Sequence, residues 1–202
     1  MNMGMNLKLK NMKVAVVGLG YVGMPLAVAL AKYGPVQGYD VNKKRVADLK
    51  EGWDSNREIS SAVLRATSCE FTDNIADIAD SQIYIVTVPT PIDDNNDPDL
   101  DIVEKASAAL GRIVKKGDII VYESTVYPGV TEDVCGPIIE RASGLKSGED
   151  FFLGYSPERI NPGDEVHTVE NITKVVAAQN DDVADLLVEL YGQMNGGNIF
   201  KA

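Results

Sequence analysis

The chain has 202 residues, of which 45% are hydrophobic and 24% are charged, and its formal net charge is −11. This composition excludes collagen-like and disordered chains, and the length allows one or two domains with a sizeable core. The acidic balance argues against nucleic-acid binding, and no apolar run is long enough to cross a membrane. Residues 1–12 lack the apolar core of a signal peptide and are expected to form a flexible extension.

Short β-branched runs alternate with segments of helical periodicity along the chain. The expected strands are 13–18, 36–40, 81–88, 118–122, 151–155, 173–178 and 198–201. The expected helices and helical turns are 21–34, 43–51, 60–66, 74–79, 102–115, 129–142 and 181–194. This alternation predicts an α/β fold, a Rossmann-like doubly wound parallel sheet with helices on both faces.

A glycine motif stands between the first expected strand and the first expected helix. Gly18, Gly20 and Gly23 form a G-x-G-x-x-G pattern, with Tyr21 and Val22 before the third glycine. The first glycine allows a tight turn, the second lets the backbone approach a pyrophosphate, and the third lets the helix pack closely on the strand. These five residues are therefore predicted to bind a dinucleotide at the helix N-terminus. The alternative is a tight strand–helix turn without a ligand.

An acidic residue ends the second expected strand, 22 residues after Gly18. Asp40 has the spacing of a carboxylate that binds the ribose 2′-hydroxyl of a dinucleotide, and its charge would repel a 2′-phosphate. NAD is therefore the predicted cofactor, in preference to NADP. The basic run Lys43, Lys44 and Arg45 is a counter-argument, because it could accommodate a phosphate.

Four segments of the sequence, taken together, resemble the UDP-glucose/GDP-mannose dehydrogenase family. They read VVGLGYVGMPLA, VTVPTPID, YESTVYPGVT and GYSPERINPGD. The sequences of these segments are most similar to those of the UDP-N-acetylhexosamine 6-dehydrogenases of the Vi-antigen and O-antigen type. The resemblance covers residues 13–202 and implies that they form the N-terminal NAD-binding domain of a longer protein.

The resemblance also implies an activity, partners and a location. Enzymes of this family are cytoplasmic and oxidise the C6 alcohol of a UDP-sugar to a carboxylate with two NAD, for surface polysaccharide biosynthesis. A central helix, a C-terminal UDP-sugar domain, and the catalytic cysteine and lysine are expected beyond residue 202, in a full-length homodimer. The 202-residue chain alone is expected to bind NAD without oxidising a sugar.

Four residues at strand ends match positions that line the NAD cleft in the family. Thr87 and Thr90 stand at the carboxyl end of the strand within 81–88, and Ser124 and Thr125 follow the next strand. This placement fits the rule that ligands of open α/β sheets lie outside the carboxyl ends of the strands. The resemblance implies that Thr125 also helps to hold the water that hydrolyses a thioester intermediate.

A fifth matching position lies in the SPER segment. Glu158 resembles an active-site acid near the nicotinamide and the sugar. Glucose-specific relatives carry a second glutamate four residues later, where this chain has Pro162. The identity of the general base therefore stays open.

The remaining residues with reactive side chains are assigned to structural roles. Cys69 and Cys135 lack a nearby histidine or a glycine-rich setting, and His167 is predicted to lie on the surface. The acid-rich segment 93–101 lacks the glycine and the closing glutamate of a calcium loop, so no metal site is predicted. The alternative functions are a UDP-glucose 6-dehydrogenase, a 3-hydroxyacid-type NAD dehydrogenase and a non-catalytic NAD-binding regulator.

Overall fold

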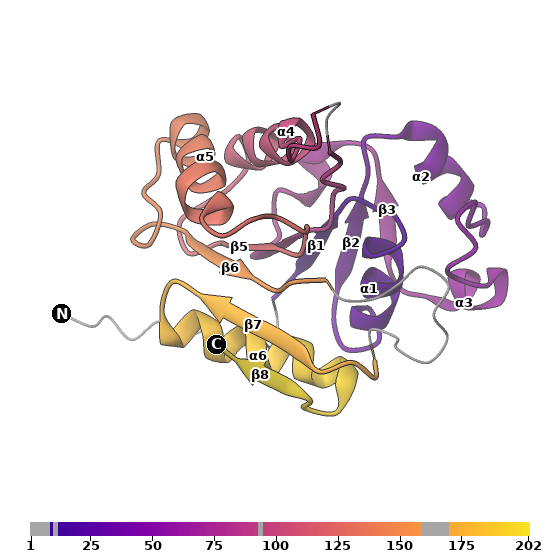
Figure 1. Cartoon of the computed structure of the whole chain (residues 1–202). Coiled ribbons are helices and arrows are strands. Elements are labelled where there is room, and N and C mark those ends of the chain that lie inside the picture. Colours follow the sequence, from indigo (N-terminus) through magenta and orange to yellow (C-terminus); the bar gives the residue numbers. More distant parts are fainter. Residues whose placement is uncertain (1–8, 10–11, 93–94, 159–169) are drawn as a thin grey trace.

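The computed structural model of the chain describes residues 9, 12–92, 95–158 and 170–202 (Figure 1). Eight strands form one sheet in the order β3-β2-β1-β4-β5-β6-β7-β8. The sequence order reverses beside β1, which makes the crevice between the ends of β1 and β4 the switch point of a doubly wound sheet. The strands are β1 Val14–Val17, β2 Val36–Tyr39, β3 Glu70–Thr72, β4 Ile83–Val86, β5 Ile119–Tyr122, β6 Phe152–Tyr155, β7 Lys174–Ala178 and β8 Ile199–Lys201.

One strand pair departs from the predicted parallel sheet. β7 runs antiparallel to β6, with Tyr155 opposite Ala177, whereas every other neighbouring pair of named strands is parallel. Parallel neighbours require a crossover connection, usually a helix, and the sequence predicts no helix between these two strands. The antiparallel pairing therefore fits the sequence better than the parallel pairing that was expected.

Most helices lie where the periodicity of the sequence predicts them. The segment 129–142 differs, because a π-helix occupies its first half and an α-helix the second. Helix α1 is also shorter than the predicted 21–34. The helices are α1 Gly23–Leu30, α2 Lys43–Lys50, α3 Ser61–Ala66, the 3₁₀-helix η2 Ile75–Ile78, α4 Asp101–Gly111, the π-helix η3 Val130–Cys135, α5 Gly136–Ser143 and α6 Asp181–Asn195.

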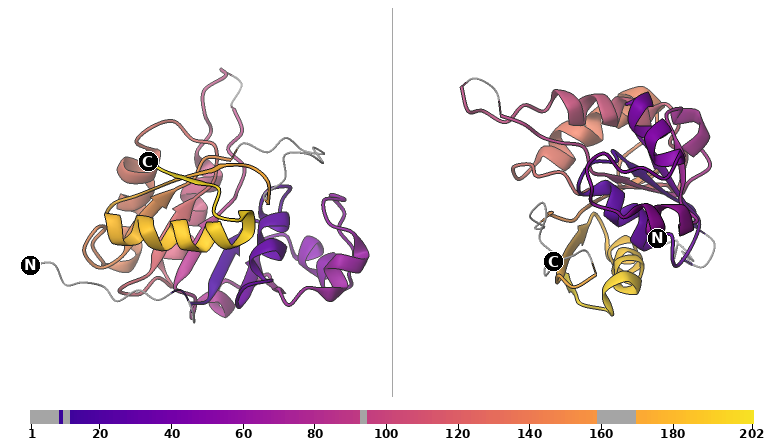
Figure 2. Two further views of the ribbon diagram at one scale, coloured as in Figure 1. Left: turned by 90° about the horizontal axis from the view of Figure 1, so that it is seen from below. Right: turned by 90° about the vertical axis from the view of Figure 1, so that its right-hand side faces the viewer.

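The hydrophobic core is divided between the two faces of the sheet. Val14 and Val16 of β1 contribute to the core with α1 and α6, while Ala15 and Val17 contribute to the core with α4 and α5. Successive residues of a strand point to opposite faces, so a strand with both faces covered is apolar throughout. Figures 1 and 2 show α4 and α5 on one side of the sheet and α6 on the other.

Little is described before the first strand. Leu9 is buried and packs with the core on the α1 and α6 side, whereas residues 1–8 and 10–11 of the predicted extension lie outside the described residues. Within the described part of the chain, no helix is long and apolar enough to cross a membrane.

Candidate functional site

A cleft of about 570 Å³ lies at the carboxyl ends of the central strands. Its walls come from the segments that follow β1, β2, β4, β5 and β6, and from one side of α4. The structure brings all the predicted site residues to this cleft except Gly23, which lies behind it. The residues of the prediction that line the cleft are Gly18, Gly20, Tyr21, Val22, Asp40, Thr87, Thr90, Ser124, Thr125 and Glu158.

The three glycines of the motif meet three different requirements. Gly18 has a φ of 97°, a conformation that a residue with a side chain rarely adopts. A Cβ atom on Gly23 would lie 1.9 Å from the Gly18 carbonyl oxygen and 2.3 Å from Thr87 Oγ1. A Cβ atom on Gly20 would meet no protein atom within 4 Å. The positive φ therefore explains the first glycine and close packing explains the third, while the open space over Gly20 fits the close approach of a pyrophosphate to the backbone.

The Asp40 carboxylate is fixed beside the glycine turn. The Leu19 N–H donates to Asp40 Oδ2 (2.8 Å), and the Asn42 N–H donates to Asp40 Oδ1 (2.8 Å). The side chain is half-buried and lines the cleft. A carboxylate has about four lone-pair sites, so two backbone donors leave acceptor capacity for a ribose hydroxyl.

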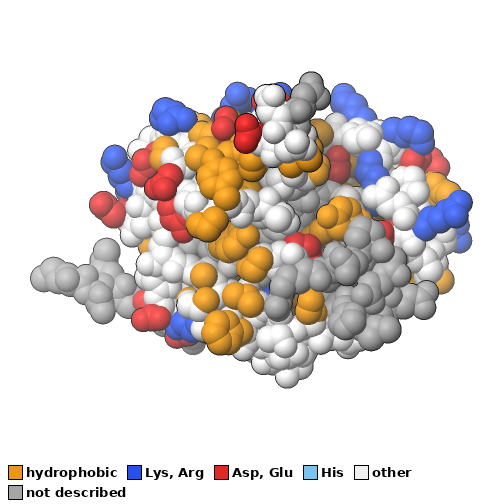
Figure 3. Space-filling view, viewed as in Figure 1, with side chains coloured by type: hydrophobic (Ala, Val, Ile, Leu, Met, Phe, Trp, Pro, Cys, Tyr) orange, Lys and Arg blue, Asp and Glu red, His pale blue; other side chains and the backbone are white. Residues whose placement is uncertain are grey.

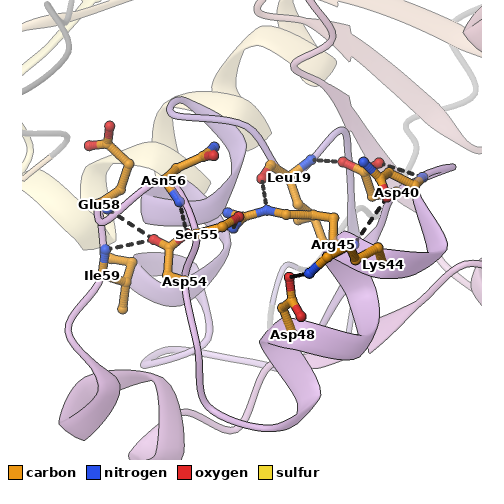
Figure 4. Close-up of polar contacts among 11 residues, drawn as sticks. Leu19, Asp40, Lys44, Arg45, Asp48, Asp54, Ser55, Asn56, Glu58 and Ile59 are labelled. Carbon is orange, nitrogen blue, oxygen red and sulfur yellow. Dashed lines mark hydrogen bonds and ion pairs between the residues drawn. The ribbon is translucent and has the colours of Figure 1, made fainter.

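Two of the three basic side chains after Asp40, those of Lys44 and Arg45, pair with carboxylates (Figure 4). Arg45 Nε donates to the Leu19 carbonyl (2.9 Å), and Arg45 Nη1 pairs with Asp54 Oδ1 (2.5 Å). The Lys44 ammonium pairs with Asp48 on the next turn of α2 (2.7 Å). Because Arg45 would have to break a buried ion pair to reach a phosphate, the geometry favours NAD over NADP.

Asp54 organises the loop on the other side of Arg45. Its carboxylate accepts hydrogen bonds from the backbone N–H groups of Asn56, Glu58 and Ile59. Burial opposes ionisation of Asp54, but the Arg45 hydrogen bond and these backbone donors outweigh it and lower the pKa of the carboxyl. The ion pair therefore connects this loop to the glycine turn through Leu19.

The hydroxyl groups of the strand-end residues mainly join the walls of the cleft. Thr87 Oγ1 donates to the Gly18 carbonyl (2.7 Å), Ser124 Oγ to the Val88 carbonyl (2.6 Å), and Thr90 Oγ1 to the Thr125 carbonyl (2.5 Å). These bonds fix the loops after β1, β4 and β5 relative to one another. The Thr125 residue itself is exposed to the cleft.

Two charged residues of the site were not predicted from the sequence. Glu123 directly follows β5, is 1% exposed and lines the cleft, and the Lys174 ammonium at the start of β7 pairs with it. Lys174 Nζ also lies 3.7 Å from Glu158 Oε2. The place of Glu123 at a strand end was a signal for this role. Lys174 gave none, because only the antiparallel direction of β7 brings its first residue to the carboxyl end of β6.

Most of the charged side chains of the protein lie on its surface. On the face shown in Figure 3, acidic and basic side chains lie mainly around the margin, and hydrophobic side chains lie nearer the middle. Solvent and salt screen exposed charges over about 10 Å, so the −11 total does not prevent an anionic cofactor from binding local backbone dipoles.

The sequence profile of the UDP-glucose/GDP-mannose dehydrogenase family, NAD binding domain, matches residues 12–195. The chain belongs to this family. The profile is that of the NAD-binding domain, which confirms the family, the Rossmann-like fold and NAD as the cofactor of this domain.

Relatives of the family match along nearly the whole chain. The UDP-N-acetyl-D-glucosamine 6-dehydrogenase of Pseudomonas aeruginosa is 50% identical over 195 residues, which are 96% of this chain and 46% of that protein. The enzyme of the same name from Salmonella typhi is 49% identical over 191 residues, 94% of this chain and 45% of that protein. The chain thus spans about half the length of these relatives.

Solved structures of the family agree with this fold. The structure of UDP-D-ManNAc dehydrogenase from Pyrococcus horikoshii has a TM-score of 0.86 and 30% identity, and the match covers 95% of this chain and 47% of that one. A ternary complex of GDP-mannose dehydrogenase from Pseudomonas aeruginosa has a TM-score of 0.84 and 27% identity, with 94% and 46% covered.

Both cysteines of this family member are buried and free, and neither lines the cleft. Burial raises the pKa of the Cys69 thiol to about 12 and also raises the pKa of Cys135. At pH 8 neither thiol should react promptly with a disulfide reagent in the folded protein, and both should react after unfolding in urea. Prompt reaction of the native chain in a thiol titration would contradict the structural role assigned to the two cysteines.

Two other residues named in the sequence analysis, Pro162 and His167, lie outside the described residues.

Proposed function

We propose that this chain is the NAD-binding part of a UDP-N-acetylhexosamine 6-dehydrogenase, which oxidises the sugar C6 alcohol to a carboxylate for surface polysaccharide biosynthesis. The observation that carries the proposal is the 50% identity to the Pseudomonas aeruginosa UDP-N-acetyl-D-glucosamine 6-dehydrogenase over 96% of the chain. The cleft at the switch point of the sheet supports it, because it joins the glycine turn, Asp40 and Glu158 in one site.

The residues of the cleft have different roles in binding the cofactor. Gly18 and Gly23 shape the turn, Gly20 leaves the backbone accessible to the pyrophosphate, and Asp40 accepts a hydrogen bond from the adenosine ribose. Bound NAD supplies the hydride acceptor for alcohol oxidation. Tyr21 and Val22 complete the wall at the start of α1.

The opposite wall serves the reacting end of the cofactor. Thr87 and Thr90 hold the loop after β4, and Ser124 the loop after β5, so that this wall of the cleft is rigid. Thr125, which is exposed there, holds the hydrolytic water, and Glu158 acts as an acid–base group close to the sugar. These are proposals from the family resemblance, and the positions of both residues on the cleft support them.

The proposal extends to the rest of the protein. The UDP-sugar is bound mainly by a C-terminal domain, residues 13–202 form the NAD-binding domain, and the full-length protein is a cytoplasmic homodimer. The decisive assay is NADH formation by the full-length protein with UDP-N-acetylglucosamine beside UDP-glucose. Two NADH per acetylated sugar and little from UDP-glucose would support the proposal, and activity on UDP-glucose alone would overturn the substrate assignment.

The role of Asp40 can be tested on this chain by itself. The Asp40→Asn variant removes the negative charge and should weaken NAD binding about tenfold, because a charge-assisted hydrogen bond to the ribose is lost. It should weaken NADP binding less, since repulsion of the 2′-phosphate is lost at the same time. Calorimetric titration of the parent chain and of Asp40→Asn with NAD and with NADP measures the two effects. An unchanged ratio of NAD to NADP affinity would exclude Asp40 from the ribose site.

A further inference from the structure

Two buried carboxylates on the wall of the cleft and the buried lysine beside them form a charged cluster, and we call Glu123, Lys174 and Glu158 the acidic cluster. The Lys174 side chain is 5% exposed, and the Glu123 and Glu158 side chains are 0% and 7% exposed. Lys174 pairs with Glu123 Oε2 and lies 3.7 Å from Glu158 Oε2, so this ammonium group lies close to both carboxylates. With all three groups ionised, the acidic cluster carries one net negative charge.

The second carboxylate oxygen of Glu123 is buried beside the cleft. Glu123 Oε1 is buried and accepts no hydrogen bond from the described residues, although the side chain lines the cleft. The Tyr191 ring packs 5.4 Å from Lys174 Nζ, and its hydroxyl lies close enough to Glu123 to lower the pKa of that carboxyl, although no well-aligned hydrogen bond joins the two groups. A buried carboxylate oxygen without a donor is costly, and a bound group of positive or donor character would compensate for it.

The topology of the sheet places the acidic cluster at one particular end of the cofactor. Asp40 follows β2, the glycine turn follows β1, and Glu123 and Glu158 follow β5 and β6 on the far side of β4. A dinucleotide with its adenosine ribose on Asp40 and its pyrophosphate on the glycine turn must extend toward β4, β5 and β6. Its nicotinamide therefore lies at the end of the cleft that carries the acidic cluster.

The two redox states of the cofactor differ in charge at that end only. The nicotinamide ring carries one positive charge in NAD⁺ and none in NADH, while the pyrophosphate is the same in both. We propose that the acidic cluster selects the oxidised over the reduced cofactor, an inference that rests on the NAD site described above. A buried charge acts through a low dielectric and is weakly screened, so one net charge is enough to change the relative affinities.

The electrostatics of Glu123 agree with this selection. Burial raises the pKa of the Glu123 carboxyl, the charge of Glu158 adds to the rise, and Lys174 and the Tyr191 hydroxyl oppose it. A positive ring beside Glu123 would oppose the rise as well. The ionised acidic cluster and the oxidised ring therefore stabilise each other, which the neutral ring of NADH cannot do.

The test compares the affinities of the chain for NAD⁺ and NADH. The Glu123→Gln variant keeps the size of the side chain and the pairing of Lys174 with Glu158, but it removes one negative charge. NAD⁺ should bind about three- to tenfold more weakly, and the affinity for NADH should change by less than about twofold. The matched control is Asp118→Asn, the same chemical change in a buried acid at the other end of β5. It should leave the ratio of the two affinities unchanged.

A second variant tests the same inference if Glu123→Gln does not fold. Glu158→Gln removes the other carboxylate charge from the end of β6 and should reduce the preference for NAD⁺ in the same direction. The inference is wrong if both variants weaken the binding of NAD⁺ and of NADH equally, or if neither variant changes either affinity. In both cases the NAD site itself stands. If the unsubstituted chain binds neither nucleotide, the proposed function fails, and the inference fails with it.

Discussion

The Gly23→Ala variant should bind NAD at least about tenfold more weakly and should be destabilised by about 3 kcal/mol. Its Cβ atom would lie 1.9 Å from the Gly18 carbonyl oxygen, which is backbone and cannot rotate away. Helix α1 would have to move off the strand, and the N–H groups at its start would move with it. The gain in helix propensity from alanine, about 1 kcal/mol, does not offset such a clash. Urea denaturation and calorimetric titration with NAD measure the two effects.

Alanine substitutions at two other glycines distinguish an effect on packing from an effect on the approach of the ligand. Gly20→Ala places its Cβ in open space, so the free energy of unfolding should stay within about 0.5 kcal/mol of the parent while NAD affinity falls. Gly34→Ala, away from the cleft and also in open space, should change neither quantity. An equal loss of stability in all three variants would show that the clash at Gly23 does not explain its effect.

The Asp54→Asn variant should lose about 3–5 kcal/mol of unfolding free energy, because it leaves the Arg45 guanidinium buried without its counter-charge. The two side chains are 0% and 8% exposed and pair at 2.5 Å. NAD affinity should fall as well, since Arg45 also holds the Leu19 carbonyl in the glycine turn. The control is Asp48→Asn, which removes an exposed pair with Lys44 on the same helix and should cost less than about 0.5 kcal/mol.

The same ion pair predicts a dependence on acid. The pKa of Asp54 is lowered in the folded chain, so its stabilisation is complete above the unfolded pKa of about 4 and is lost as the pH falls through the folded value. The difference in unfolding free energy between the parent and Asp54→Asn should therefore shrink below about pH 4. A difference that stays constant down to pH 2 would show that the charge of Asp54 contributes nothing.

Short segments of the sequence were enough to predict most of the residues that line the cleft. The glycine motif needs only a strand, a turn and a helix in succession, and Asp40 needs only the spacing of the next strand. Thr87, Thr90 and Ser124 were placed by the resemblance to the family, and their positions fit the general rule that ligands lie at strand ends. Periodicity likewise predicted the helices and every strand except β3, although not the change from π-helix to α-helix between Val130 and Ser143.

Contacts between distant segments could not be predicted in this way. Glu123 and Lys174 are 51 residues apart, and no local pattern in either segment indicates that their side chains pair. The basic run after Asp40 was ambiguous for a related reason, because its meaning depends on Asp54 in the following loop. Charge alone left a phosphate site possible, whereas the fold uses Arg45 to support the glycine turn.

The central claim is that NAD crosses the carboxyl ends of the strands from Asp40 to the acidic cluster. A crystal structure of this chain grown with NAD tests it most directly. We predict that the adenosine ribose bonds to Asp40, that the pyrophosphate lies over Gly20 at the start of α1, and that the nicotinamide lies beside Glu123 and Glu158. NAD bound outside this cleft, or with its adenine end at the acidic cluster, would contradict the account.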